Sequence, residues 1–247
     1  LGGENICGIL VEPVKEGKYE TVIAYMGYGS EVWYPGPSDN PQRVQFLLCH
    51  RNQALNRKPG EKDDWCVRGL ESKETYYYRG AFADAVRAID FVCSREKVDQ
   101  DRLFAEGGSQ GGALTLIAAS LDHRIDAIAP SVPFLSDYKD YFQIVHWPGE
   151  PILKAAAEKG ISDEDLYKTL SYFDVKNFTD RIQCPVLMAF GLQDPVCPPH
   201  TNFSGYNMIK APKRWICYPY TGHDVWKVPE WPQEVETWYR EFSTSSK

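Results

Sequence analysis

The stretch Gly107-Gly108-Ser109-Gln110-Gly111-Gly112 decides how this chain of 247 residues is expected to fold. The short apolar run 102–106 precedes it, and the apolar run 113–119 follows it. This order predicts a strand, a very tight turn and a helix, with a serine at the apex of the turn. The flanking glycines lack Cβ atoms, which allows the strand and the helix to approach each other closely.

The spacing Gly107-x-Ser109-x-Gly111 is that of the nucleophile elbow in the α/β-hydrolase fold. A helix that begins beside Ser109 presents its free N–H groups to an anion formed there. A phosphate-binding turn is the alternative, and it is disfavoured because no lysine follows the glycines. The stretch therefore predicts that Ser109 is a nucleophile.

Strand and helix patterns alternate on both sides of this turn. Strands are predicted at 5–12, 21–26, 44–49, 125–130, 185–190 and 215–218, and amphipathic helices at 80–96 and 229–242. Such alternation predicts one α/β domain over residues 1–247, with a mostly parallel central sheet and helices on both faces. Residues 133–178 interrupt the alternation, and we expect them to form a small helical cap inserted over the site.

A serine nucleophile needs a base, and the base needs a carboxylate that orients it. In an α/β-hydrolase the acid follows the serine in the chain, and the histidine comes last. Asp194 follows the strand at 185–190, and His223 follows the strand at 215–218. Both are expected at the sheet edge that carries Ser109, because the carboxyl ends of parallel strands meet there.

The rival acid and bases fit this arrangement less well. His200 follows two prolines and is expected to begin a helix, while His50 precedes the serine in the chain. His123 and His146 are expected at a helix end and in the cap. Asp224 is a rival acid, but as the immediate neighbour of His223 it is poorly placed to hold that ring.

The oxyanion of an acyl-serine intermediate needs N–H donors. The backbone N–H of Gln110 is the first candidate, because it follows the nucleophile. Tyr28 is the second, in the Gly27-Tyr28-Gly29 loop after the strand at 21–26, although this stretch alone slightly favours a simple turn. The predicted chemistry requires no metal ion and no organic cofactor.

Composition limits the partners. The net charge is −7 and no basic block occurs, which argues against nucleic acid, and no apolar run approaches membrane-spanning length. None of the seven cysteines forms a Cys-x-x-Cys pair, which argues against a zinc ribbon. The odd number of cysteines favours a reducing compartment such as the cytoplasm, although it also leaves room for one disulfide. Because the sequence starts at Leu1 and not at Met, residues upstream can be missing, and the compartment is left open.

Several stretches are more specific than the serine turn: Tyr76-Tyr77-Tyr78-Arg79, Val132-Pro133-Phe134-Leu135, Thr169-Leu170-Ser171-Tyr172-Phe173-Asp174, Cys197-Pro198-Pro199 and Gly222-His223. Together they resemble the acetyl xylan esterase and cephalosporin-C deacetylase group, carbohydrate esterase family seven, and the similarity runs from Gly8 to Phe242. The resemblance implies a serine esterase that removes acetyl groups from acetylated sugars, such as xylo-oligosaccharides, and from small acetate esters. It implies the triad Ser109, Asp194 and His223, oxyanion donors at Tyr28 and Gln110, and a homo-oligomer such as a trimer or hexamer.

The chain departs from the family at its Arg-Gly-Gln signature. Asn52 replaces the glycine, and Ala54 replaces the glycine that usually follows the glutamine, so added Cβ atoms could alter the backbone. The family's His-Glu pair is His223-Asp224 here, and residues 65–70 resemble the family's subunit-contact loop. Two alternatives stay open: a broader short-chain carboxylesterase or serine peptidase on the same fold, and a catalytically inactive carbohydrate-binding or scaffold protein.

Overall fold

The computed structural model describes residues 4–33 and 42–243. Within these residues the sheet has seven strands, β1 (Gly8–Val11), β2 (Tyr19–Tyr25), β3 (Val44–Leu48), β4 (Val98–Gly108), β5 (Ala127–Ser131), β6 (Val186–Gly191) and β7 (Lys213–Tyr218). Their order across the sheet is β1-β3-β2-β4-β5-β6-β7. β1 runs antiparallel to β3, and the other neighbouring pairs are parallel. The predicted α/β fold with a mostly parallel sheet is thereby confirmed.

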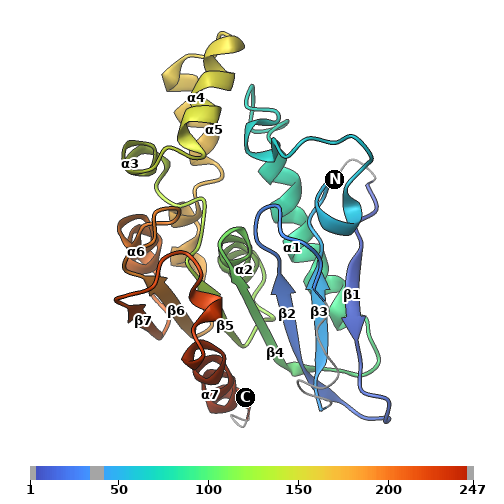
Figure 1. The fold of residues 1–247 in the computed structure, drawn as a ribbon. Helices are drawn as coiled ribbons and strands as arrows, with labels where there is room; N and C mark the ends of the chain where they lie inside the picture. The colour runs from blue at the N-terminus through green and yellow to red at the C-terminus, as the bar shows by residue number, and fades with distance from the viewer. Residues whose placement is uncertain (1–3, 34–41, 244–247) are drawn as a thin grey trace.

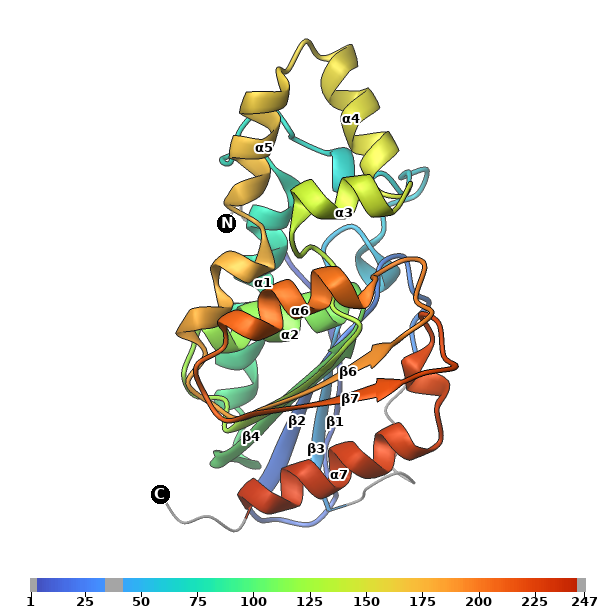
Figure 2. The same ribbon diagram turned by 90° about the vertical axis from the view of Figure 1, so that its left-hand side faces the viewer.

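Helices cover both faces of this sheet, as its apolar strands require. These helices are α1 (Tyr77–Cys93), α2 (Gln110–Leu121), α6 (Pro199–Met208) and α7 (Glu230–Ser243). Figure 2 shows α1, α2 and α6 on one face and α7 alone on the other. Every residue of β5 and β6 is buried between these layers, which explains why β6 is apolar throughout and why Ser131 is the one polar residue of β5. The core therefore lies on both sides of the strands that lead to Ser109.

The chain between β5 and β6 contains three more helices, α3 (Tyr138–Ile144), α4 (Gly149–Glu158) and α5 (Asp163–Ser171). Figure 1 shows them above the C-terminal ends of the parallel strands. The Ser162 hydroxyl accepts a hydrogen bond from the Asp165 N–H, as expected for the residue that caps α5. These helices lie within residues 133–178, for which the sequence predicts a cap, and this stretch is called the cap segment below.

Short 3₁₀ helices complete the described chain: η1 (Ala54–Asn56), η2 (Trp65–Val67), η3 (Val175–Asn177), η4 (Thr179–Arg181) and η5 (Val225–Lys227). All seven cysteines have free thiols. No helix in residues 4–33 and 42–243 combines the length and apolar character needed to cross a bilayer.

The backbone at the altered signature keeps a conformation that suits glycine. Asn52 has φ 60° and Ala54 has φ 48°, both in the left-handed region. Asparagine tolerates this region well, whereas alanine is strained there. We expect Ala54→Gly to raise the free energy of unfolding by roughly 0.5–1 kcal/mol, because relief of strain outweighs the greater entropy of unfolded glycine.

Asn52→Gly is the matched control, and its effect is expected to stay within about 0.5 kcal/mol. Urea unfolding at pH 7.5 measures both variants against the parent chain. A loss of stability in Ala54→Gly would show that the contact of the Ala54 methyl group with the small cluster of Ala24, Met26, Leu47 and Cys49 matters more than the strain.

Candidate active site

Ser109 lies between β4 and α2 in a strained turn, with φ 58° and ψ −120°. Its N–H donates to the Ser131 carbonyl at 3.0 Å, and its own carbonyl accepts from the Phe134 N–H at 3.0 Å. Backbone bonds to the end of β5 and to the start of the cap segment therefore fix a conformation that serine disfavours. The side chain is 9% exposed at the carboxyl edge of the sheet.

The glycines around Ser109 are required by close backbone contacts. A Cβ atom on Gly107 would lie 2.5 Å from the carbonyl carbon of Gly111. A Cβ atom on Gly111 would lie 2.0 Å from the carbonyl oxygen of Tyr25, at the end of β2. The sequence interpretation of these glycines, as positions where strand and helix meet closely, is confirmed.

Asp194 and His223 form a hydrogen-bonded pair. His223 Nδ1 lies 2.8 Å from Asp194 Oδ2, and the Asp194 side chain is completely buried. Asp194 Oδ1 accepts from the N–H groups of Val196 at 2.7 Å and Cys197 at 2.8 Å. Since an ionised carboxylate only accepts hydrogen bonds, His223 carries its proton on Nδ1, and the lone pair of Nε2 is available as a base.

Two side chains link this pair to the serine turn. The Trp226 ring meets the His223 ring edge to face, with centroids 5.4 Å apart. The same tryptophan covers Gly108, where a Cβ atom would lie 2.9 Å from Trp226 Cε3. Within the described chain, no hydrogen bond of 3.5 Å or less joins Ser109 to His223, a contact that often tightens only when substrate binds.

Cys197 is the second link, because its N–H binds Asp194 and its thiol contacts Ser109. Burial raises the pKa of the Cys197 thiol well above its usual value, although hydrogen bonds with Tyr141 and Ser109 oppose this. The thiol therefore stays protonated at neutral pH, and thiolate is the reactive form of cysteine. This leaves the Ser109 hydroxyl as the candidate nucleophile of this site.

The two predicted oxyanion donors lie on neighbouring segments. Gln110 is the first residue of α2, so its N–H has no acceptor within that helix. Tyr28 follows β2, which pairs with β4 so that Tyr25 lies opposite Gly107. In the part of the chain that the structure describes, the Tyr28 N–H has no hydrogen-bond acceptor. Both N–H groups are therefore available to an anion beside Ser109.

The Gln53 side chain connects the loop that contains Tyr28 to the start of α2, where Gln110 lies. Its Oε1 accepts from the Gly29 N–H at 2.9 Å, and its Nε2 lies 3.3 Å from Gln110 Oε1. Gln53 Nε2 also donates to the Tyr77 hydroxyl, and the Tyr78 hydroxyl donates to Gln110 Oε1. This buried network positions the segments that carry the Tyr28 and Gln110 N–H groups.

Comparison with known proteins decides the family of this chain. Residues 1–240 match the family described as acetyl xylan esterase (AXE1). The chain belongs to the acetyl xylan esterase family. The acetyl esterase Axe7A of Xylanibacter ruminicola is 32% identical over 237 residues, an alignment that covers 89% of this chain and 52% of that protein. The chain thus spans about half the length of this curated relative.

Solved structures of the acetyl xylan esterase family agree with this fold. The acetyl xylan esterase from Paenibacillus sp. R4 is 32% identical, with a TM-score of 0.88 over 96% of this chain and 79% of that one. The enzyme from Thermoanaerobacterium sp. JW/SL YS485 is 28% identical, with a TM-score of 0.85 and the same coverages. The acylaminoacyl peptidase of Pyrococcus horikoshii, at 13% identity and a TM-score of 0.75 over 100% of this chain and 41% of its own, shares the fold alone.

The alternative base His200 and the alternative acid Asp224 do not join the Asp194–His223 pair of this acetyl xylan esterase family member. His200 begins α6 as expected and bonds to Asp140 Oδ2 at 2.9 Å. With Asp137 these two could in principle hold a metal ion, but Lys176 and Ser204 already engage Asp137. The Asp224 carboxylate pairs with Lys227 instead of His223.

His50 is buried against the residue that precedes the Gly27-Tyr28-Gly29 loop. Its Nε2 lies 2.5 Å from the Met26 carbonyl, and its Nδ1 has no hydrogen-bond partner among the described residues. Burial lowers the pKa of His50 from 6.5 to about 4, although the Met26 carbonyl and Asp84 oppose this shift. The folded protein therefore holds a neutral His50 at pH values where the unfolded chain protonates it.

Because this pKa is depressed in the folded state, the stability it confers is complete above pH 6.5 and is lost as the pH falls toward 4. Between pH 7 and pH 4.5 the expected loss from this group is about 2–3 kcal/mol. His50→Gln, whose amide can donate to the same carbonyl, should show a correspondingly smaller loss. Denaturant unfolding of both proteins over this pH range measures the difference, and equal pH dependence would exclude His50 as a source.

Three contributors to the site are not predicted from the sequence. Gln53 lies in the recognised signature, but only the fold brings its amide to Gly29 and Gln110. Trp226 stands three residues after His223, which is its one local signal, and Cys197 lies in the recognised Cys-Pro-Pro stretch. The contacts of these three side chains depend on how far apart the strand ends lie in the fold, and the sequence alone does not predict that distance.

Proposed function

We propose that this chain is a serine esterase that removes acetyl groups from acetylated sugars, such as xylo-oligosaccharides, and from small acetate esters. The observation that carries the proposal is the buried Asp194–His223 pair beside a serine in a strained turn, in a chain of the acetyl xylan esterase family. Ser109, Asp194 and His223 are its proposed catalytic triad. The backbone N–H groups of Gln110 and Tyr28 are its proposed oxyanion hole.

The proposed reaction uses this geometry in two steps. His223 Nε2 takes the proton of the Ser109 hydroxyl as Ser109 Oγ attacks the acetyl carbonyl, and the protonated imidazole then gives that proton to the leaving alcohol. Water activated by His223 hydrolyses the acetyl-serine and restores the free serine. Each oxyanion donor contributes about 3 kcal/mol to the stability of the charged intermediates.

Initial rates on 4-nitrophenyl esters with acyl chains of two, four and eight carbons test the esterase proposal. We expect rapid acetate hydrolysis and a fall of kcat/KM with chain length, because a site built for acetate has no room for a longer acyl chain. Release of acetate from acetylated xylo-oligosaccharides tests the sugar substrate. A maximum at butyrate or octanoate would favour the broader carboxylesterase, and an inactive but folded protein would favour a binding or scaffold role.

We also propose that the chain forms a homo-oligomer, a trimer or hexamer, as its resemblance to the family implies. The stretch 65–70 is less available for this purpose than the sequence suggests, because Trp65, Cys66 and Leu70 are buried within the chain itself. A contact through this stretch would use its partly exposed residues, such as Arg68. Light scattering on the protein as it elutes from a sizing column measures the mass, and a mass of 28.1 kDa would reject the proposal.

A further inference from the structure

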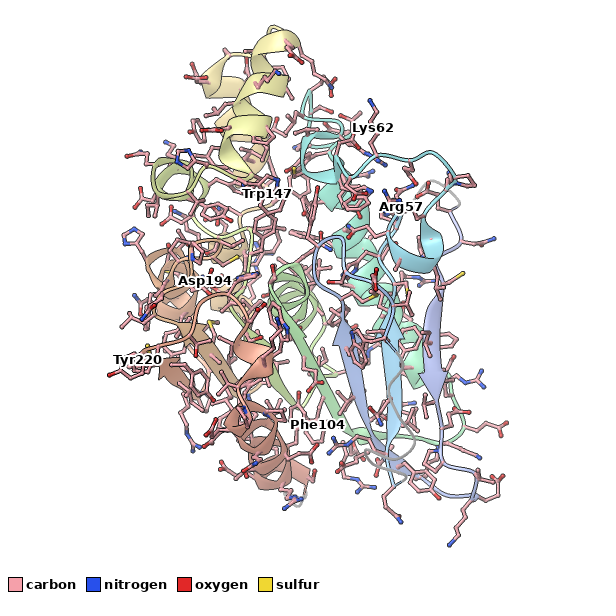
Figure 3. The ribbon with its side chains drawn as sticks, viewed as in Figure 1. Arg57, Lys62, Phe104, Trp147, Asp194 and Tyr220 are labelled. Atoms are coloured by element: carbon pink, nitrogen blue, oxygen red, sulfur yellow. The ribbon has the colours of Figure 1, made fainter. Side chains whose placement is uncertain are left out.

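We propose that Trp147, in the cap segment, is a binding platform for the sugar ring of the substrate, which is the alcohol part of the ester. The inference rests on the proposed function and adds a subsite to it. Trp147 lies between α3 and α4, and its side chain is 39% exposed. Figure 3 shows it on the side of the cap segment that faces the loop carrying Arg57 and Lys62, above Asp194.

The packing of Trp147 fixes which part of its ring is open. The indole lies nearly parallel to the buried Phe134 ring, with centroids 5.6 Å apart and planes at 13°. It also meets the Tyr28 ring edge to face, at 5.0 Å between centroids. Phe134 covers one face of the indole, so a ligand can stack on the part of the ring that Phe134 and Tyr28 leave exposed. A rigid, half-open aromatic face of this kind is typical of ligand-binding sites.

Both rings that support Trp147 belong to residues whose backbone borders the reacting atoms. The Phe134 N–H donates to the carbonyl of Ser109, and the Tyr28 N–H is the second proposed oxyanion donor. An acetyl carbonyl bound at Ser109 occupies the space between the donors and His223. The alcohol part of the ester must then extend away from Ser109, and we infer that it passes the Trp147 ring, because Trp147 packs on both Phe134 and Tyr28.

The surroundings of the platform suit a sugar better than an alkyl chain. The Tyr28 hydroxyl donates to the backbone carbonyl of Asp63 at 3.3 Å, so the residue that carries the Asp63 carboxylate borders the Tyr28 ring. That carboxylate forms an exposed ion pair with Arg57. A pyranose ring offers C–H groups on its face and hydroxyl groups around its edge, so it can stack on Trp147 and hydrogen-bond to such polar groups. An ethyl group can do neither.

The test compares two substrates in the same protein samples. The variants are Trp147→Ala, Trp147→Tyr and the control Trp215→Ala, which removes another half-exposed tryptophan on the edge strand β7. The substrates are acetylated xylobiose, which has sugar rings, and ethyl acetate, which has none. The ratio of the two kcat/KM values is independent of how much of each sample is folded, so a loss of stability does not obscure the result.

We expect Trp147→Ala to lower kcat/KM for acetylated xylobiose by about 10–50-fold, mainly through KM, which corresponds to about 1.4–2.3 kcal/mol of lost stacking. The loss for ethyl acetate should be at least fivefold smaller. Trp147→Tyr should keep most of the sugar preference, because a flat ring remains, and Trp215→Ala should leave the ratio unchanged.

Equal losses on both substrates, or no loss on either, would overturn the platform while leaving the proposed function intact. If Trp147→Tyr keeps the sugar preference, the effect comes from stacking on a flat ring and not from the filling of space alone. A folded Trp147→Tyr that has lost the sugar preference would also contradict the inference. A parent enzyme that hydrolyses ethyl acetate but not acetylated xylobiose would instead reject the proposed substrate class. With 4-nitrophenyl acetate as a third substrate, a loss of kcat/KM in Trp147→Ala as large as the loss for acetylated xylobiose would also contradict the inference, because it would assign Trp147 to planar rings in general.

Discussion

Replacing Ser109 by alanine is expected to lower kcat for 4-nitrophenyl acetate by about 10⁵–10⁶-fold, to a level set by binding and the oxyanion donors alone. The reason is that no other group at the site can replace its hydroxyl as nucleophile. The nearest candidate, the Cys197 thiol, is buried and its raised pKa keeps it protonated. Water would have to attack the ester directly, and the acetyl-enzyme would not form.

The fold of Ser109→Ala should be unchanged, because serine already adopts a positive φ at this position and alanine would have to adopt the same one. The backbone bonds to Ser131 and Phe134 also remain. Ser120→Ala is the matched control: its hydroxyl is also buried, but it donates to Leu116 within α2. This variant should keep at least half of the parent kcat. Acetylation of the protein by 4-nitrophenyl acetate, followed by mass spectrometry, should add one acetyl group to the parent and none to Ser109→Ala. Normal turnover in Ser109→Ala would reject the proposed nucleophile.

Replacing Asp194 by asparagine is expected to lower kcat by about 10³–10⁴-fold with a small change in KM. Asp194 accepts three hydrogen bonds, one from His223 Nδ1 and two from the N–H groups of Val196 and Cys197. Asparagine can keep the two backbone bonds through its single carbonyl oxygen. Its NH₂ group then faces His223 Nδ1, which must give up its proton to accept that bond.

The imidazole of this variant would therefore carry its proton on Nε2 and could not take one from Ser109. Nitrogen-15 NMR of the His223 side chain reports this change of tautomer directly, together with the loss of kcat. Asp224→Asn is the matched control, since its carboxylate neighbours His223 in sequence but pairs with Lys227, and its activity should stay within about threefold. Loss of activity in Asp224→Asn but not in Asp194→Asn would reverse the assignment of the acid.

The strands and the principal helices could be predicted because their signals are local. β6 lies within one residue of its predicted bounds, since an unbroken apolar run ends at glycine. α7 buries Trp231, Val235, Trp238 and Tyr239, four of the five residues whose spacing predicts its inner face. The positions of Asp194 and His223 could be predicted for a related reason. Parallel strands end at the same edge of the sheet, so residues that directly follow two such strands in the sequence lie at that edge.

The features that the sequence did not predict depend on distant contacts. α3 is not among the predicted helices, because the groups that stabilise its start are far away in the chain. The Asp174 carboxylate accepts from the N–H groups of Asp137 and Tyr138, 37 and 36 residues before it. The antiparallel direction of β1 has no local signal either, since a single strand of four residues reads the same in both directions.

The close contacts around the reacting groups also determine where this protein can change. A Cβ atom on Gly191 would lie 1.9 Å from the carbonyl oxygen of Gly222, next to His223, just as one on Gly111 would strike Tyr25. Even a methyl group does not fit at these two glycines, so single substitutions there cannot change the backbone around the proposed triad in small steps. The cap segment, inserted between two strands, carries no proposed triad residue. New substrate ranges should therefore be sought, in laboratory libraries and in natural divergence, among residues 133–178.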